Sequence, residues 1–320
     1  MGLDYNSIKI LLWAKNLGVS FDRILTLGHQ GLDCSPSRFR RVLRNFGLSA
    51  TEEDLVRCLD HGPCTSLYAD EFLRLLGATE VASVDRSDFE GATLVHDLNE
   101  RFPEEQRSRF TLVLDGGTLE HVFDYPAALR HCLELVALSG HFITIAPAQN
   151  QMGHGFYQIS PELFFRVLSG ENGFTLRKMV LFDTSRIDAP FFEVRDPALT
   201  GKRSQLVSER PMQLAVLAQR TDIKPILKKP PQQSDYAAAW ERHQVATRAA
   251  KPSFPDSNIE RLRSALNPYW PYWLRRLRRR LAYSWNSGAP TLRNRQHFRR
   301  ISRQEIFRER SGNQTTEGHR

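Results

Sequence analysis

The sequence predicts an α/β fold for residues 1–220, and three observations support this prediction. Short runs of β-branched and aliphatic residues alternate with segments of helical periodicity, which is typical of a sheet covered by helices. The chain has 320 residues, 41% hydrophobic and 25% charged, as in an ordinary globular protein with a substantial core. We find no internal repeat and no apolar run near the roughly 18 residues of a membrane span. These observations favour one large α/β domain or two modest ones and exclude a small disulfide-stapled scaffold.

Seven segments have the composition of buried strands. In chain order they are 23–27, 80–84, 92–96, 110–114, 141–146, 174–182 and 212–219. A helical pattern precedes the first strand at 7–15, and others lie between strands at 126–138 and 160–168. Gly140 is expected to stop the helix at 126–138. The first two strands are separated by about fifty residues with helical periodicity. We therefore predict a helical insertion over 35–78.

The connection between the last two strands is long for an α/β protein. It runs from Asp183 to Arg210 and is polar, with breaks at Pro190 and Pro197. Connections longer than about 12–15 residues are usually functional. We expect substrate contacts in this segment.

The chain changes character after residue 220. Residues 221–320 carry 21 Lys and Arg against 8 Asp and Glu, a net charge of +13, whereas residues 1–220 carry −5. We predict one α/β domain over 1–220, a linker over 221–268, a basic amphipathic helix over 269–287 and a disordered tail over 288–320. A short helix within the linker is expected at 236–247.

The segment from Trp270 to Trp285 has two functional interpretations and one purely structural one. Its leucines and tryptophans recur at helical spacing, and arginines fill the positions between them. Such a helix can lie on an anionic membrane surface, or its arginines can contact nucleic-acid phosphates. Alternatively, it docks on the main domain with its arginines in water. The tryptophans at both ends favour the membrane interpretation.

Cysteine usage and the N-terminal residues bear on the compartment. Four cysteines at irregular spacing fit reduced thiols better than a disulfide framework. The first residues lack a basic region followed by an apolar stretch, so no secretory signal is apparent. We expect a cytoplasmic protein, with peripheral binding to the inner membrane surface through its tail.

The carboxyl ends of the predicted strands carry a set of residues suited to an adenosine ligand. In an open parallel sheet, ligands bind at these ends. Gly28 and Gly31 would let the backbone approach a ligand, Asp85 or Asp88 would accept hydrogen bonds from ribose hydroxyls, and Asp97 would accept one from an adenine amine. Asp115 and Gly116 follow the fourth strand as a further ligand loop. The alternative is that the glycines form tight turns and the aspartates only cap the next elements.

The fourth strand and the residues after it carry a family resemblance. The segment is Phe110-Thr111-Leu112-Val113-Leu114-Asp115-Gly116-Gly117-Thr118-Leu119-Glu120-His121-Val122. It resembles the corresponding segment of class I S-adenosylmethionine-dependent methyltransferases, and the order of elements agrees across residues 21–220. The resemblance implies a Rossmann-like, seven-stranded mixed sheet with helices on both faces and an antiparallel last strand. It also implies S-adenosylmethionine as cofactor and methyl transfer as the reaction of the domain at 1–220.

The chain departs from this family at its first motif. Where the family usually has an acidic residue followed by Gly-x-Gly-x-Gly, this chain has Thr26-Leu27-Gly28-His29-Gln30-Gly31-Leu32. Only the first glycine of the motif is present in register. This departure motivates an alternative function, a binding or scaffold protein that has lost the cofactor chemistry.

Two histidines are candidate catalytic residues. Removal of a proton from a hydroxyl acceptor is favoured by a histidine or carboxylate whose pKa lies near the working pH. His121 closes the Leu-Glu-His-Val motif, and His154 lies in a glycine-flanked loop after the fifth strand. Glu120 and Tyr157 are predicted to contact the acceptor. A structural, hydrogen-bonded role is the alternative for each histidine.

The sequence lacks the motifs that mark metal sites and other common catalytic sites. Cys58, His61 and Cys64 have no matching fourth ligand, so we predict no metal site. The usual hydrolase, P-loop and zincin motifs are missing from the sequence. We therefore predict a methyltransferase acting on a hydroxyl of a small molecule or glycan, because the acidic region 1–220 disfavours a polyanionic acceptor. An RNA methyltransferase that relies on the basic tail is a third hypothesis.

Overall fold

The computed structural model describes residues 2–59, 67–249 and 291–308. The chain divides into two compact units. The first comprises residues 1–194, 208–231 and 300–320, and the second comprises 195–207 and 232–299. Most of the secondary structure lies in the first unit.

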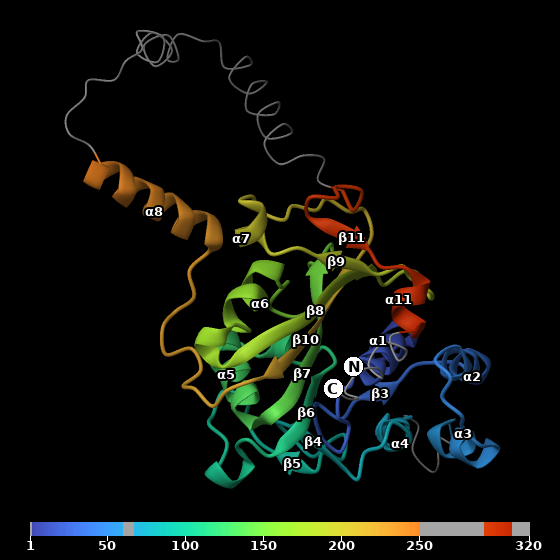
Figure 1. Cartoon of the computed structure of the whole chain (residues 1–320). Coiled ribbons are helices and arrows are strands. Elements are labelled where there is room, and N and C mark those ends of the chain that lie inside the picture. The colour runs from blue at the N-terminus through green and yellow to red at the C-terminus, as the bar shows by residue number, and fades with distance from the viewer. Residues whose placement is uncertain (1, 60–66, 250–290, 309–320) are drawn as a thin grey trace, which may run out of the picture. The chain divides into compact units, whose positions relative to one another are not determined.

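A mixed sheet forms the centre of the first unit (Figure 1). Its parallel part has the order β5-β4-β2-β6-β7, in which β2 is Arg23–Leu27, β4 is Glu80–Asp85, β5 is Leu94–Val95, β6 is Phe110–Asp115 and β7 is Val136–Gln149. Antiparallel β10 (Met212–Arg220) lies between β7 and β8 (Phe174–Asp183). The seven predicted strands therefore all form, and the last of them is antiparallel, as the resemblance implies.

The sheet has more strands than the predicted seven. Within the described residues this sheet has nine strands, and the two additional ones are β9 (Phe192–Val194) and β11 (Phe298–Arg300). Both strands are too short for a periodic pattern to be recognised. A separate two-stranded sheet pairs β1 (Gly2–Leu3) with β3 (Gly31–Leu32).

Helices cover both sides of the sheet (Figure 1). On one side lie α1 (Tyr5–Asn16) and the helical insertion, which consists of α2 (Pro36–Asn45), α3 (Glu52–Leu59) and α4 (Asp70–Leu75). On the other side lie α5 (Tyr125–Leu135) and α6 (Pro161–Val167). Three short 3-10 helices, η1 (Glu104–Gln106), η2 (Leu119–His121) and η3 (Gly170–Asn172), complete the connections. The predicted helical insertion is confirmed.

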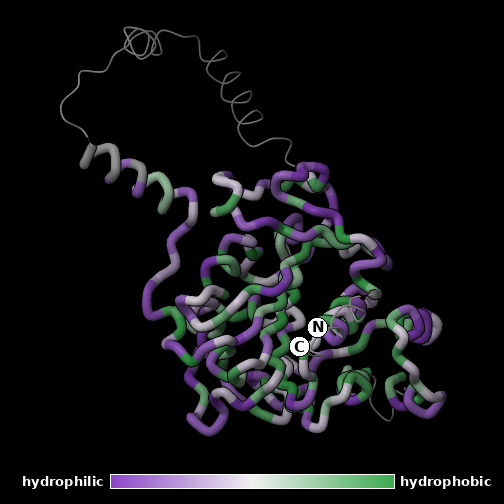
Figure 2. Tube along the Cα trace, viewed as in Figure 1, coloured by the Kyte–Doolittle hydropathy of each residue, from purple (hydrophilic) through white to green (hydrophobic). Residues whose placement is uncertain are grey.

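Burial explains why these segments form these elements. The central strands are nearly continuous apolar runs because both faces are covered by helices. Figure 2 shows hydrophobic residues concentrated along these strands. At the start of α1, Asp4 Oδ1 accepts a hydrogen bond from the Ser7 backbone N–H at 2.8 Å, the usual N-cap arrangement.

The prediction that Gly140 stops a helix is wrong. Helix α5 ends at Leu135, and Gly140 lies inside β7. A Cβ at this position would lie 2.9 Å from Ala137 O and 3.1 Å from Phe110 O. The glycine is therefore required by the close approach of neighbouring backbone and not by helix termination.

Residues 291–308 are structured, although disorder was predicted for 288–320. Residues 291–308 of the predicted 288–320 tail contain β11 and α11 (Arg303–Arg308). Ile301 and Ile306 are buried in a cluster with Ile10, Trp13 and Phe191, and α11 lies beside α1 (Figure 1). These few apolar side chains suffice to order the segment, although its average composition is polar.

The second unit contains α7 (Pro197–Thr200) and α8 (Ser234–Ala249). Within it, Arg203 Nε donates to Asp235 Oδ2 at 2.6 Å. Helix α8 confirms the helix expected at 236–247. The predicted basic amphipathic helix over 269–287 lies outside the described residues. No described helix is long and apolar enough to span a membrane.

Candidate active site

Three of the predicted cofactor residues meet at one edge of the sheet. Strands β6, β2 and β4 are adjacent and parallel, so Asp115, Gly28 and Asp85 all lie at their carboxyl ends. Gly28 has a φ of +71°, and its N–H donates to Val84 O at 2.7 Å. A Cβ on Gly28 would lie 3.0 Å from Thr118 Oγ1 and 3.9 Å from Asp85 Oδ2. Both the backbone conformation and the close approach require a glycine here.

The side chain of Gln30 covers Gly116 at this edge. Gln30 is buried, and its Nε2 donates to Leu27 O. A Cβ on Gly116 would overlap Gln30 Oε1. That oxygen is buried and has no hydrogen-bond partner in the described part of the chain. Gln30 thus fills part of the space next to the strand ends and presents an unsatisfied acceptor there.

The other predicted cofactor residues have different surroundings. Gly31 lies in β3, where it pairs with Gly2 and bridges to Tyr68, so it is not part of the strand-end cluster. Asp97 is engaged at both oxygens, by the backbone and side chain of Asn99 and by Arg86. The backbone hydrogen bond from Asn99 is the main cause that lowers the pKa of Asp97. Asp88 is exposed in the loop after β4.

The predicted catalytic and substrate residues form a second cluster. Glu120 and His121 belong to η2, which follows β6, and His154 belongs to the loop after β7. His154 Nε2 lies 3.3 Å from Glu120 Oε1, and the ring centroids of His121 and His154 are 5.2 Å apart. The structure therefore brings together three of the four residues that the sequence assigned to chemistry or substrate binding.

The loop that carries His154 is held against the backbone of Glu120. Gly155 has a φ of +70°, and a Cβ there would lie 2.8 Å from Glu120 O. That same oxygen accepts a hydrogen bond from Phe156 N at 2.8 Å. The glycine next to His154 is thus needed for close backbone approach, and it places the imidazole beside the Glu120 carboxylate.

Two buried carboxyl groups dominate the electrostatics of this cluster. Asp115 accepts hydrogen bonds from Thr118 N at 2.8 Å and Thr144 Oγ1 at 2.7 Å, and burial raises its pKa. The carboxylate of Glu120 is fully buried, and neither oxygen has a hydrogen-bond partner among the described residues. Burial, with the nearby charge of Asp115, raises the pKa of Glu120 to about 8. Burial and the neighbouring His154 lower the pKa of His121.

Aromatic residues surround these polar groups. Tyr157 OH donates to Phe123 O at 2.7 Å, so this predicted substrate contact is also a backbone anchor. The Tyr125 ring lies 5.6 Å from that of Tyr157, and its buried hydroxyl has no hydrogen-bond partner in the residues that the structure describes. Burial, with the charges of Asp115 and Glu120, raises the pKa of Tyr125. Tyr125 was not among the predicted site residues, because in the sequence it looks like an ordinary residue at the start of a helix.

The cluster can also offer donor atoms to a metal ion. In the described ranges, Glu120, His121 and His154 are the one group of at least three potential ligands, and their donor atoms lie within 4.8 Å of one another. One carboxylate and two imidazoles suit zinc and other first-row divalent ions. Of the weak zinc candidate in the sequence, Cys58 is buried, and His61 and Cys64 lie outside the described residues.

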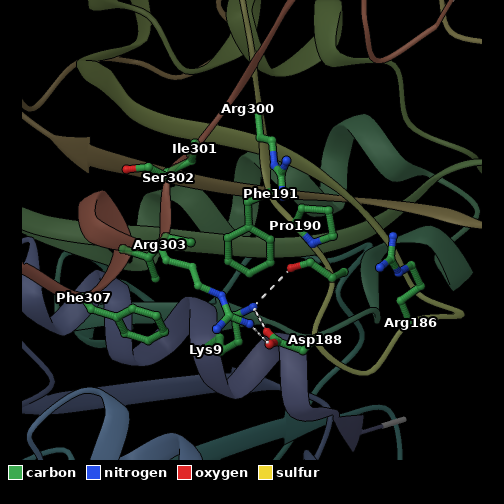
Figure 3. Close-up of a pocket in the computed structure, with 12 residues that line it drawn as sticks. Lys9, Arg186, Asp188, Pro190, Phe191, Arg300, Ile301, Ser302, Arg303 and Phe307 are labelled. Atoms are coloured by element: carbon green, nitrogen blue, oxygen red, sulfur yellow. Dashed lines mark hydrogen bonds and ion pairs between the residues drawn. The ribbon is translucent and has the colours of Figure 1, made fainter.

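A separate cavity of about 450 Å³ lies within the first unit (Figure 3). Its walls come from α1, from the segment 186–191 after β8, and from residues 300–307. Figure 3 shows Lys9 and Arg303 converging on Asp188, with Arg186 and Arg300 on other sides of the group. The predicted substrate segment 183–210 therefore contributes part of a cavity wall.

Similarity to known proteins concerns the fold alone. No protein-family model and no curated protein matches the sequence. Among solved structures, the chain is similar to a 1,6-didemethyltoxoflavin-N1-methyltransferase of Burkholderia thailandensis, with 15% identity over 68% of this chain and 78% of that one and a TM-score of 0.36. The chain is also similar to the N-methyltransferase NodS of Bradyrhizobium japonicum, with 9% identity over 68% of this chain and 98% of that one and a TM-score of 0.33. A third similar structure is a 16S rRNA (adenine(1408)-N(1))-methyltransferase of Catenulisporales acidiphilia, with 10% identity over 70% of this chain and 95% of that one and a TM-score of 0.34.

The class of fold follows from the sheet itself. The parallel strands, the antiparallel β10 between β7 and β8, and helices on both faces are the features that the resemblance implied. The chain has a Rossmann-like α/β fold with this strand order, extended by two short strands and a helical insertion.

Proposed function

We propose that the protein is an S-adenosylmethionine-dependent methyltransferase that methylates a hydroxyl group of a small molecule or glycan. The observation that carries this proposal is the meeting of Gly28, Asp85 and Asp115 at the carboxyl ends of three adjacent parallel strands. Open α/β sheets bind their ligands at this edge. A second cluster with two imidazoles and a buried carboxylate lies on the loops that follow β6 and β7.

The strand-end residues fit an adenosine ligand with an amino-acid tail. Gly28 allows close approach of a ligand to the backbone, and Asp85, at the end of β4, is the proposed acceptor of hydrogen bonds from ribose hydroxyls. Gly116 makes room for the side chain of Gln30. Gln30 Oε1 is a buried acceptor without a partner in the described residues, and an ammonium group would satisfy it. Asp88 and Asp97 lie in the two loops after β4 and β5, on the side where the adenine would bind. S-adenosylmethionine, when bound, supplies an electrophilic methyl group.

Orientation and proton removal are the tasks left to the chain. Methyl transfer is an in-line displacement, so most of the acceleration comes from holding the acceptor oxygen in line. His154 is the proposed proton acceptor, because its imidazole is partly exposed and lies next to Glu120. The proton would pass from the acceptor hydroxyl to His154. Because the pKa of Glu120 is about 8, its carboxylate would stabilise the resulting imidazolium increasingly as the pH rises through that value. His121 and Tyr157 complete the acceptor site.

A second candidate function is favoured by the position of Gln30. Its side chain covers Gly116 and fills part of the space that a cofactor would need. A binding or scaffold protein that has a methyltransferase fold and no methyl-transfer activity would tolerate a side chain in the cofactor space. The two candidates differ in one observable property, the capacity to transfer a methyl group.

Methyl transfer itself tests the proposal. The purified chain is incubated with methyl-labelled S-adenosylmethionine and with extract fractions enriched in sugars, small hydroxylated molecules or RNA. We expect label in a small-molecule or glycan fraction and not in RNA. Absence of transfer to every fraction would favour the scaffold, and label in RNA alone would overturn the assignment of the acceptor.

A further inference from the structure

The cavity in the first unit carries more positive than negative charge. Lys9, Arg186, Arg300 and Arg303 line it, and Asp188 is its one acidic lining residue among those that the structure describes. Lys9 Nζ donates to Asp188 Oδ1 at 2.7 Å, and Arg303 donates to Asp188 Oδ2 at 2.5 Å. Two cations therefore share one carboxylate.

The other two cations have no described carboxylate beside them. Arg186 and Arg300 are exposed, and neither has an ion-pair partner in the part of the chain that the structure describes. Both extend from backbone segments that meet at the cavity (Figure 3). Like charges held together raise the free energy of the protein unless an anion is present, so the arrangement favours an anionic ligand.

The base of the cavity is formed by a buried, hydrogen-bonded side chain and is not only a surface patch. Lys9 is only 4% exposed, and it also donates to Ala189 O at 3.1 Å. The buried ring of Phe191 lies 4.5 Å from Lys9 Nζ, and the half-buried side chains of Pro190 and Phe307 form an apolar wall of the cavity. A volume of about 450 Å³ lies within the range of roughly 300–1,000 Å³ that is usual for small-molecule sites. It leaves room for a sugar-sized body beside an anionic group.

We propose that this cavity binds a phosphorylated small molecule, with the phosphate held by Arg186, Arg300 and Arg303. A phosphate is preferred to a carboxylate because its greater charge matches the three excess cations, and guanidinium groups bind phosphate oxygens in a bidentate manner. Pro190 and Phe307 then contact the non-phosphate part of the molecule. Nothing in this step depends on methyl transfer.

A second step rests on the proposed function and identifies the ligand with the methyl acceptor. Met212 of β10 pairs with Gln149 at the end of β7 and with Asp183 at the end of β8. The loop that carries His154 and the loop that carries Arg186 therefore leave the sheet at the same edge. The proposed ligand would extend from the cavity along this edge toward the loop that carries His154.

Binding of pyrophosphate to the full-length chain tests the site. Pyrophosphate serves as the probe, and acetate at the same ionic strength represents a carboxylate ligand. We expect saturable calorimetric binding of pyrophosphate that weakens more than tenfold in Arg186→Gln/Arg300→Gln. The matched control is Arg38→Gln/Arg44→Gln, which removes two exposed arginines of α2 outside the cavity. Far-ultraviolet circular dichroism confirms that both double variants are folded.

The outcomes separate the alternatives. Equal loss in both double variants would show a general charge effect and overturn the site, as would no binding by the unaltered chain. Binding of acetate as tight as that of pyrophosphate would overturn the phosphate assignment. In a second arm, phosphatidylglycerol vesicles replace pyrophosphate and sedimentation measures binding. If vesicle binding depends on Arg186 and Arg300 and pyrophosphate binding does not, the phosphate that the cavity binds belongs to a lipid headgroup and the proposed small-molecule ligand is wrong. Because S-adenosylmethionine is not present in these titrations, failure of the proposed function leaves their result unaffected.

Discussion

At the scale of single residues, the contact between Gln30 and Gly116 decides how much room the strand ends leave for a ligand. We predict that Gly116→Ala lowers the free energy of unfolding by about 1–3 kcal/mol, the usual cost of overpacking. The added Cβ would overlap Gln30 Oε1. Chemical denaturation of the full chain measures this change.

The double variant Gln30→Ala/Gly116→Ala separates this overlap from other causes. Removal of the Gln30 amide takes away the overlapping atoms, so the cost of Gly116→Ala should fall to less than about 1 kcal/mol in that background. An equal cost in both backgrounds would mean that Gln30 does not cover Gly116.

His154 is the residue on which the proposed chemistry depends most. We predict that His154→Ala lowers turnover by roughly 100-fold or more, a usual contribution of a general base, while the affinity for S-adenosylmethionine stays nearly intact. Single-turnover transfer and calorimetry measure the two quantities. Met152→Ala, a change at an exposed residue of the same loop, is the matched control. Equal losses of turnover and cofactor affinity would remove His154 from the catalytic role.

The site could be predicted only in part, and the reason is physical. Strand ends, the Leu-Glu-His-Val motif and a glycine-flanked histidine leave local signals, so Gly28, Asp85, His121 and His154 could be chosen as candidates from the sequence. Burial leaves no such signal at a polar residue. The buried carboxylate of Glu120, which has His154 beside it, and the buried hydroxyl of Tyr125 both depend on neighbours distant in the chain. The cationic residues of the cavity likewise meet only through the tertiary fold.

At the scale of secondary-structure elements, long apolar segments were predictable and short ones were not. The predicted strand at 23–27 coincides with β2, and 212–219 differs from β10 by one residue. Strands β9 and β11, with three residues each, carry no detectable alternation. The end of α5 was also misplaced, because Gly140 serves close packing in β7 and not helix termination.

Helix α11 provides a direct test of the C-terminal packing. Ile306 is 3% exposed and packs in the cluster with Ile10 and Trp13. We predict that Ile306→Ala lowers the free energy of unfolding by about 2–4 kcal/mol, whereas Gln304→Ala on the exposed side of the same helix changes it by less than about 0.5 kcal/mol. Thermal and chemical denaturation provide the measurement. Equal, small effects of both changes would show that α11 does not contribute to the core.

At the scale of the whole molecule, the acidic region 1–220 and the basic remainder call for separate tests. The arginine-rich segment at 270–285 remains a predicted contact with an anionic membrane surface. Deletion of everything after position 220 would also remove Ile301 and Ile306 from the core. An internal deletion of 250–290 is therefore the better variant. We expect it to abolish sedimentation with vesicles that contain phosphatidylglycerol, while vesicles of neutral lipid bind neither form; unchanged sedimentation would contradict the membrane prediction.

Binding of S-adenosylmethionine at the carboxyl ends of β2, β4 and β6 is central to the proposed function, and calorimetric titration tests it most directly. The ligands are S-adenosylmethionine and S-adenosylhomocysteine, with a nicotinamide dinucleotide as the control. Gly28→Ala places a Cβ against Thr118, whereas Gly47→Ala changes a glycine of similar φ with open space around it. We predict saturable binding of the two sulfur ligands alone, weakened by Gly28→Ala and retained in Gly47→Ala. No binding by the unaltered chain, with or without an acceptor, would contradict this prediction and leave the scaffold function.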